Sequence, residues 1–123
     1  FFEKQGFELC DTAPPDFELW YKRFNKNAPI PVFNACAKNA ACDEPTGLTV
    51  YYTDACPFTD FYVNVELAEA AKDRNIPLII NKIDSMEKAQ QHFVPFTIFS
   101  LFYNGKFVTH QILSKNSFAK FIK

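Results

Sequence analysis

Strand-like and helix-like segments alternate through residues 47–123, and this alternation constrains the fold more than any other feature of the chain. The spacing of apolar residues predicts, in order, strand, helix, strand, helix, strand, strand and helix. These segments are expected at 48–52, 57–74, 77–81, 85–92, 96–103, 106–110 and 114–122. Asn104-Gly105 is a strong signal for a two-residue hairpin turn between the last two strands. The pattern predicts an α/β fold with the order β-α-β-α-β-β-α.

Two of the predicted strands carry apolar residues on both faces. They are the segments 77–81 and 96–103. A strand that is covered on both sides of a sheet needs apolar side chains at successive positions. We therefore expect both segments to be buried central strands.

Residues 1–24 do not continue the alternation. They predict a helical turn that ends at Gly6, followed by a β-hairpin whose loop contains Pro14-Pro15. The strands are expected at 7–10 and 17–24, with the loop at 11–16. Because two strands alone make no stable sheet, we expect this hairpin to need a partner sheet.

Residues 25–46 are predicted to be a linker. The segment carries Pro29, Pro31 and Pro45 among polar residues, and proline interrupts regular structure. A weak helical segment is expected at 34–41.

Composition narrows the classes of function. A hydrophobic fraction of 48% and 15 phenylalanines favour a folded core. The formal net charge of −1, with no basic block, argues against nucleic-acid binding, and no apolar run is long enough to span a membrane. The chain starts at Phe1 without a signal-peptide pattern, so we expect a piece of a longer, cytoplasmic protein.

The cysteines and histidines predict no metal site. The cysteines stand at positions 10, 36, 42 and 56, and no pair has the Cys-x-x-Cys spacing of zinc sites. His92 ends a predicted helix and His110 ends a predicted strand, where a surface or helix-end position is the usual outcome. Cys10 is expected in the core.

Cys56-Pro57-Phe58-Thr59 is the candidate site, because it follows a predicted strand and opens a helix. Pro57 suits the first helical position, which makes Cys56 the N-cap. The backbone N–H groups of Phe58 and Thr59 would then point at the sulfur and favour the thiolate, and the Thr59 hydroxyl could join them. The alternative is that Cys56 is a small hydrophobic residue that fills the start of the helix.

Neighbouring residues have two interpretations each. Asp54 raises the pKa of the thiol by charge repulsion or stabilises the turn through its own backbone. Phe58, Phe61 and Tyr62 form an apolar lip for a ligand, or the last two pack on the core.

The segment from Gly47 to Lys123 resembles the thioredoxin superfamily. Cys56-Pro57-Phe58-Thr59 stands at the position of the family's Cys-x-x-Cys, and Val94-Pro95 stands at that of its cis-proline. The resemblance implies a thioredoxin-like fold in which Pro57, Phe58, Val94 and Pro95 contact a substrate beside Cys56 and Thr59. Thr59 replaces the second cysteine, so an internal disulfide is impossible and only monothiol chemistry stays open. Cys36 or Cys42 could resolve a mixed disulfide, or both are packing or surface residues of the linker.

The front of the chain resembles the end of a GNAT acetyltransferase domain. In that family a helix ends in a Tyr-x-Lys-x-Gly-Phe pattern before two antiparallel strands, and Phe2-Glu3-Lys4-Gln5-Gly6-Phe7 is similar to it. Phe2 stands where many GNAT enzymes have a general-acid tyrosine. A GNAT domain, a proline-bearing linker and a thioredoxin-like domain with Cys-Pro-aromatic-Thr are the arrangement of proteins with a YoaP-like C-terminal domain.

These resemblances imply a longer parent protein that is an acetyl-CoA-dependent N-acetyltransferase. Residues 1–24 would end its GNAT domain, 25–46 would be the linker and 47–123 the YoaP-like domain. No cofactor is expected in this fragment, because Gly6, Gly47 and Gly105 are too scattered to form a pyrophosphate-binding turn.

Three roles are open for the YoaP-like segment. In the first, the segment is an accessory domain whose partner is the acetyltransferase domain of the same chain. In the second, it is a monothiol redox enzyme or sensor that takes a thiol or a small ligand at Cys56. In the third, it is a structural or dimerising domain.

Overall fold

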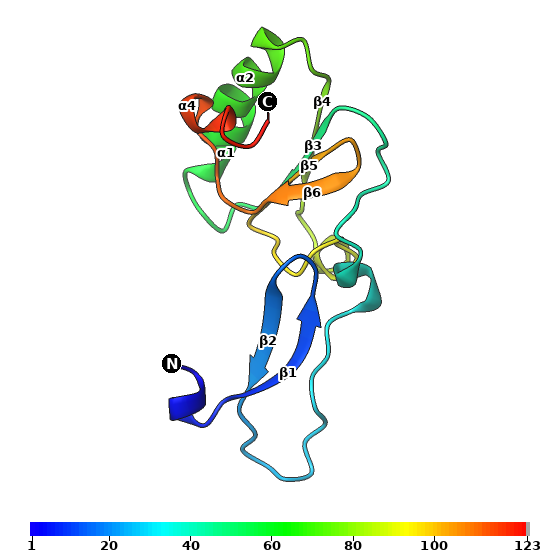
Figure 1. Cartoon of the computed structure of the whole chain (residues 1–123), viewed down its shortest axis with the longest axis vertical. Coiled ribbons are helices and arrows are strands. Elements are labelled where there is room, and N and C mark those ends of the chain that lie inside the picture. Colours follow the sequence, from blue (N-terminus) through cyan, green and yellow to red (C-terminus); the bar gives the residue numbers. More distant parts are fainter. Residues whose placement is uncertain (123) are drawn as a thin grey trace.

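The structure is a computed structural model that describes residues 1–122. It contains a two-stranded sheet near the N-terminus and a four-stranded sheet that follows it, and residues 22–47 form the connecting segment between the two sheets. The two sheets lie one above the other in an elongated molecule, and the ends of the chain are far apart (Figure 1).

The described chain is a mixed α/β structure. Its strands are β1 (Glu8–Ala13), β2 (Phe17–Tyr21), β3 (Leu48–Tyr52), β4 (Leu78–Lys82), β5 (Phe99–Tyr103) and β6 (Lys106–Thr109). Its α-helices are α1 (Thr59–Phe61), α2 (Ala68–Asp73), α3 (Met86–Gln90) and α4 (Lys115–Phe118). A π-helical segment, Tyr62–Leu67, joins α1 to α2, and short 3-10 helices span Glu3–Gln5 and Ala35–Lys38.

The four-stranded sheet has the order β4-β3-β5-β6. β3 pairs in parallel with β4 and antiparallel with β5, and β6 returns antiparallel to β5. The predicted turn joins β5 and β6, with φ of 50° at Asn104 and 83° at Gly105. These left-handed values at both central residues match the strand twist of a tight hairpin.

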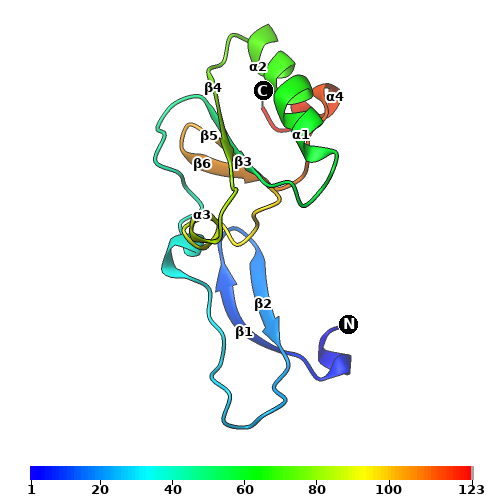
Figure 2. The same cartoon turned by 180° about the vertical axis from the view of Figure 1, so that it is seen from behind.

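Each face of this sheet is covered by different elements. Leu48, Val50 and Tyr52 point to the face that packs against Val63 and against further residues of the helices, because successive side chains of a strand alternate. The helices α1, α2 and α4 lie together on that face, whereas α3 lies near the connecting segment (Figures 1 and 2). The main core therefore lies between β3, β5 and the helix 59–73.

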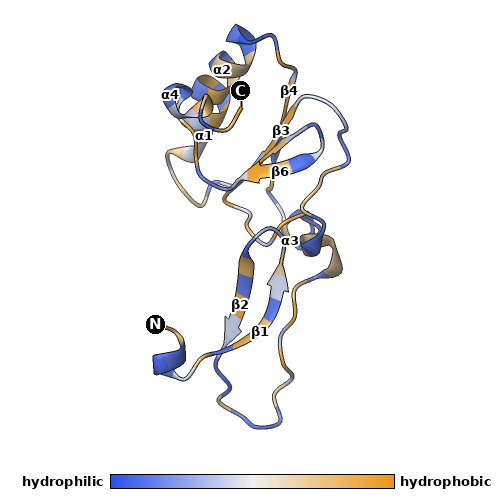
Figure 3. Cartoon of the chain, in the orientation of Figure 1, coloured by the Kyte–Doolittle hydropathy of each residue, from blue (hydrophilic) through white to orange (hydrophobic). Residues whose placement is uncertain are grey.

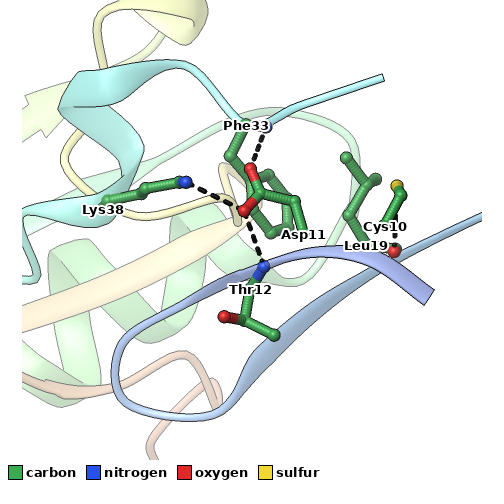
Figure 4. A network of polar contacts seen from close by, with 6 residues as sticks. All are labelled: Cys10, Asp11, Thr12, Leu19, Phe33 and Lys38. Atoms are coloured by element: carbon green, nitrogen blue, oxygen red, sulfur yellow. Dashed lines mark hydrogen bonds and ion pairs between the residues drawn. The ribbon is translucent and has the colours of Figure 1, made fainter. Parts of the chain in front are cut away.

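The hairpin β1–β2 is attached to the rest of the chain by polar and aromatic contacts. The Asp11 carboxylate accepts hydrogen bonds from the Phe33 N–H at 2.8 Å and the Lys38 ammonium at 2.8 Å (Figure 4). The Phe17 ring lies 5.8 Å from that of Phe107 on β6. Hydrophobic and hydrophilic residues alternate at the start of β2 (Figure 3).

The end of the connecting segment pairs with the β5–β6 hairpin. The Phe107 N–H donates to the carbonyl of Ala40, and the Cys42 N–H donates to that of Gly105, both at 2.9 Å. These bonds place residues 40–42 along the free edge of β6. The edge is thereby protected from pairing with other chains.

Several predicted boundaries were wrong. β1 extends to Ala13, because Asp11, Thr12 and Ala13 pair with β2 beyond a bulge at Cys10, and the loop is confined to 14–16. β2 ends at Tyr21, β5 begins at Phe99, and α4 ends at Phe118. The predicted segments at 48–52 and 106–110 correspond closely to β3 and β6.

The expectation of a central strand at 77–81 was also wrong. β4 lies at the edge of the sheet, where Ile79 is 39% and Ile80 is 37% exposed. The antiparallel partner β5 occupies the other side of β3, so β3 and β5 take the central positions. Apolar residues on both faces of a segment do not reveal which edge of it is paired.

None of the helices within residues 1–122 combines the length and the apolar character that crossing a membrane requires.

Candidate thiol site

Cys56 lies between the end of β3 and the start of the first helix, as predicted, but it is not the N-cap. The Thr59 N–H donates to the Cys56 carbonyl at 3.2 Å, which closes a turn of the 3-10 type. The first α-type bond runs from the Tyr62 N–H to the Phe58 carbonyl. The helix therefore begins at Thr59 with Phe58 as its N-cap, and Pro57 belongs to the preceding turn.

The surroundings of the Cys56 sulfur stabilise its thiolate form. The Phe58 N–H is the largest cause that lowers the pKa of the thiol, and the Thr59 hydroxyl and N–H lower it further. Partial burial of the sulfur acts in the opposite direction. A partly exposed cysteine with a lowered pKa has the properties of a nucleophile.

Thr59 is the most buried residue of the tetrad. It has no exposed surface, and its hydroxyl oxygen makes no hydrogen bond of standard geometry. The same hydroxyl lies close enough to the Cys56 sulfur to lower the pKa of the thiol. Its dipole therefore stabilises the negative charge of the Cys56 thiolate. A buried hydroxyl without a partner is unfavourable for folding, so its position is unexplained by stability alone.

A shallow hollow of about 520 Å³ lies beside the sulfur. It is lined by Cys56, Phe58, Tyr62, Ile112, Ser114 and Ser117. Phe58 is 68% exposed at the edge of this hollow. Phe61 is exposed too, and its ring meets that of Tyr62 at 5.6 Å.

Val94 and Pro95 are not lining residues of this hollow. Val94 is buried, and Pro95 is half-buried. The peptide bond between them is trans, which corrects the expected cis form; the cis bond within residues 1–122 is Pro14–Pro15. Residues 93–95 bend before β5, and the Phe93 carbonyl accepts the Ala40 N–H at 3.1 Å, so this segment is held by the connecting segment.

Asp54 does not act mainly on its own backbone. Its carboxylate pairs with the Lys82 ammonium at 2.8 Å, and this contact raises the pKa of Lys82. The pair connects the turn after β3 to the end of β4. Both side chains are well exposed, so the pair is weak.

The remaining cysteines are free thiols. Cys10 and Cys36 donate to backbone carbonyls, of Leu19 and Gln90, both at 3.2 Å. Cys42 approaches the Glu44 carbonyl at 3.7 Å. Cys10 is half-buried rather than part of the core. Within the described residues, no group of three or more potential ligands is placed to hold a metal ion.

His92 was expected at the surface or at a helix end; it follows the end of α3, but it is buried, with 3% of its surface exposed. Its Nε2 lies 2.6 Å from the Ser100 hydroxyl, and its ring lies 4.8 Å from that of Tyr51. No local sequence signal points to this contact, because it joins the segment after α3 to β3 and β5. His110 is half-buried between the rings of Phe17 and Phe96.

Comparisons with known proteins agree in part with the resemblances. Residues 77–120 match the family described as YoaP-like. The chain is 38% identical, over 99% of its length, to a Bacillus subtilis (strain 168) protein named uncharacterized N-acetyltransferase YoaP. The chain spans about half of that relative, 48% of its length. No solved structure matches the chain.

Proposed function

We propose that this chain is the C-terminal part of a GNAT-family N-acetyltransferase, in which the segment from residue 47 onward is a thioredoxin-like accessory domain. The observation that carries the proposal is the 38% identity along 99% of the chain to a protein named an N-acetyltransferase. The relative is about twice as long as the chain, which leaves room for a catalytic domain.

The topology of the larger sheet supports a thioredoxin-like interpretation. One parallel strand pair, β3 with β4, is followed by the antiparallel strands β5 and β6 in the order β4-β3-β5-β6. The helices α1 and α2 follow β3, α4 follows β6, and these helices cover the same face of the sheet. Cys56 lies where the first strand meets its helix, which is the position expected for the thiol of such a domain.

An accessory role needs a physical connection between the two parts. Phe17 provides one, because its ring lies 5.8 Å from Phe107 and 5.5 Å from His110. Asp11 provides another through Phe33 and Lys38 of the connecting segment. The hairpin, which is the proposed end of the catalytic sheet, is thus fastened to the accessory sheet.

The described residues do not fit the pyrophosphate of acetyl-CoA. Gly6 ends a 3-10 helix, and Gly105 lies in the β5–β6 turn. At Gly47 a β-carbon would meet the Pro77 carbonyl oxygen at 2.8 Å, so this glycine permits close backbone packing. Each glycine has a structural role of its own, and we place the acetyl-CoA site of the parent outside this chain.

The test is a kinetic comparison on the full-length protein, with acetyl-CoA consumption measured over a panel of amines. Phe17→Ala removes the ring that joins the hairpin to the larger sheet. We expect kcat/KM for the acceptor to fall by about threefold or more, with the KM for acetyl-CoA unchanged. Phe24→Ala is the matched control, because that ring is 92% exposed. Unchanged kinetics for Phe17→Ala would remove the accessory role, and no transfer by the native protein would remove the acetyltransferase assignment.

A second candidate function is monothiol exchange at Cys56, which the lowered pKa of that thiol favours. In such a step the Cys56 thiolate attacks one sulfur of a disulfide R–S–S–R′. The bond Cys56–S–S–R forms, the original S–S bond breaks, and R′–S⁻ leaves with the electron pair. The thiolate of a second thiol then attacks the sulfur of R, a disulfide between R and that thiol forms, the bond to Cys56 breaks, and Cys56 leaves as its thiolate.

A further inference from the structure

We propose that a second hollow, between the end of β4 and α3, binds an uncharged planar heteroaromatic ligand. The hollow has a volume of about 490 Å³. Its lining comes from β3, the end of β4, α3 and the segments on either side of α3. The hollow beside Cys56 is lined by residues in or next to α1 and α4, and the two linings share no residue. The two sites are therefore independent.

Aromatic rings line one side of this hollow. The rings of Tyr51 and His92 lie 4.8 Å apart, and Phe93 lies 5.9 Å from Tyr51 and 6.1 Å from His92. All three belong to the lining. Aromatic side chains prefer to pack against other rings in stacked or edge-to-face geometry, so a planar ligand suits this wall better than a saturated one.

The aromatic wall is electrically neutral. Burial lowers the pKa of His92 to about 4, and burial is the largest cause that raises the pKa of Tyr51 to about 12. Both side chains are therefore uncharged at neutral pH. The Ser100 hydroxyl fixes the orientation of the imidazole through its Nε2, which leaves the Nδ1 edge as the other polar site of the ring.

The charged residues of the rim are already paired. Lys88 lies 2.7 Å from Asp84, and Lys82 lies 2.8 Å from Asp54. Because no unpaired charge lines the hollow, an ionised ligand would lose hydration there without gaining a free counter-charge. The rim thus favours a neutral ligand.

Two amide side chains complete the lining. Asn81 and Gln91 each offer donor and acceptor groups to a ligand edge. A heteroaromatic ring with a carboxamide or an amino group presents complementary donors and acceptors in one plane. This combination of rings and amides defines the proposed ligand class.

The test is an NMR titration of the ¹⁵N-labelled chain with nicotinamide as the probe. Nicotinate is the charged comparator and cyclohexanecarboxamide the non-planar one. We expect saturable shifts of the Gln91 and Phe93 amide signals with nicotinamide, and dissociation constants for both comparators at least about tenfold weaker. Equal binding of all three compounds, or no saturable shift with nicotinamide, overturns the proposal.

Two pairs of variants locate the binding. Phe93→Leu and Gln91→Ala are each expected to weaken nicotinamide binding by about fivefold. Their matched controls are Phe96→Leu, a half-buried ring outside the lining, and Gln111→Ala, an exposed amide outside it; both are expected to bind like the native chain. Because Gln91 is exposed, its variant is expected to remain folded. Native affinity in both lining variants overturns the proposal.

Discussion

The Nε2 of His92 lies 2.6 Å from the hydroxyl oxygen of Ser100, and both residues are buried against the sheet. Burial holds the imidazole neutral, since its pKa is lowered from 6.5 to about 4. The unfolded chain thus binds a proton between these two pH values that the folded chain does not bind. The stability that depends on a neutral His92 is fully present above pH 6.5 and is lost as the pH falls toward 4.

We therefore expect the free energy of unfolding to drop by about 2 kcal/mol between pH 7.5 and pH 5. Urea unfolding at the two values measures it. The aspartates whose pKa is lowered, such as Asp11 and Asp84, lose their stabilising effect only below about 3.8, outside this window. His92→Asn is expected to flatten the pH dependence, and a native chain with equal stability at both values would contradict the assignment.

The Thr59 hydroxyl is predicted to act on the Cys56 thiol and not on folding. In a background with Cys10, Cys36 and Cys42 changed to serine, the pH dependence of iodoacetamide alkylation reports the pKa of Cys56. We expect it below the ordinary value, and Thr59→Val should raise it, because the variant removes a group that lowers it. The variant should be no less stable than the parent, because the buried hydroxyl that it loses has no hydrogen-bond partner.

Thr49→Val is the control for that experiment. Thr49 also has a buried hydroxyl without a partner, but it does not affect the pKa of Cys56. The pH dependence of Cys56 alkylation in this variant should match that of the serine background in which Thr49 and Thr59 are unchanged. A Cys56 pKa at or above about 8.5 would count against any thiol function of the site.

Gly47 is predicted to be the least replaceable glycine of the chain. Its φ is 77°, and a β-carbon would lie 2.8 Å from a backbone oxygen of Pro77, which also accepts the Leu48 N–H. Gly47→Ala should lower the free energy of unfolding by about 3 kcal/mol. Gly6→Ala, with φ of 83° but only the flexible Lys22 side chain nearby, should lower it by about 1 kcal/mol. Urea unfolding compares them, and similar losses would refute the packing argument.

Asp11 is predicted to fasten the hairpin to the connecting segment. Its contacts with Lys38 and the Phe33 N–H lower the pKa of its carboxyl, so the contacts persist above pH 3.8 and weaken as the pH falls below it. Asp11→Ala should speed hydrogen exchange of the Phe33 amide by about tenfold at neutral pH. Asp16→Ala, in the exposed turn, should leave that rate unchanged. No change in the Asp11 variant would show that the hairpin is held by other contacts.

Much of the fold was predictable from residue patterns. β3 was placed correctly because a short run of strand-forming residues is bounded by Gly47 and a turn. Asn104-Gly105 specified the hairpin between β5 and β6 through the backbone preferences of those two residues. Cys56 was placed between strand and helix for the same local reason. The exact start of that helix was missed, since a 3-10 turn and an α-helical turn differ by one hydrogen bond that residue types do not specify.

The sequence alone determined the elements of this protein, because strand, turn and helix preferences depend on neighbours along the chain. Only the tertiary structure decided that β4 is an edge strand, that His92 meets Ser100, and that Asp11 reaches the connecting segment. Each of these depends on which surfaces pack together across many residues. A buried pair such as His92 and Ser100 arises from the arrangement of whole strands, so no spacing within the sequence could reveal it.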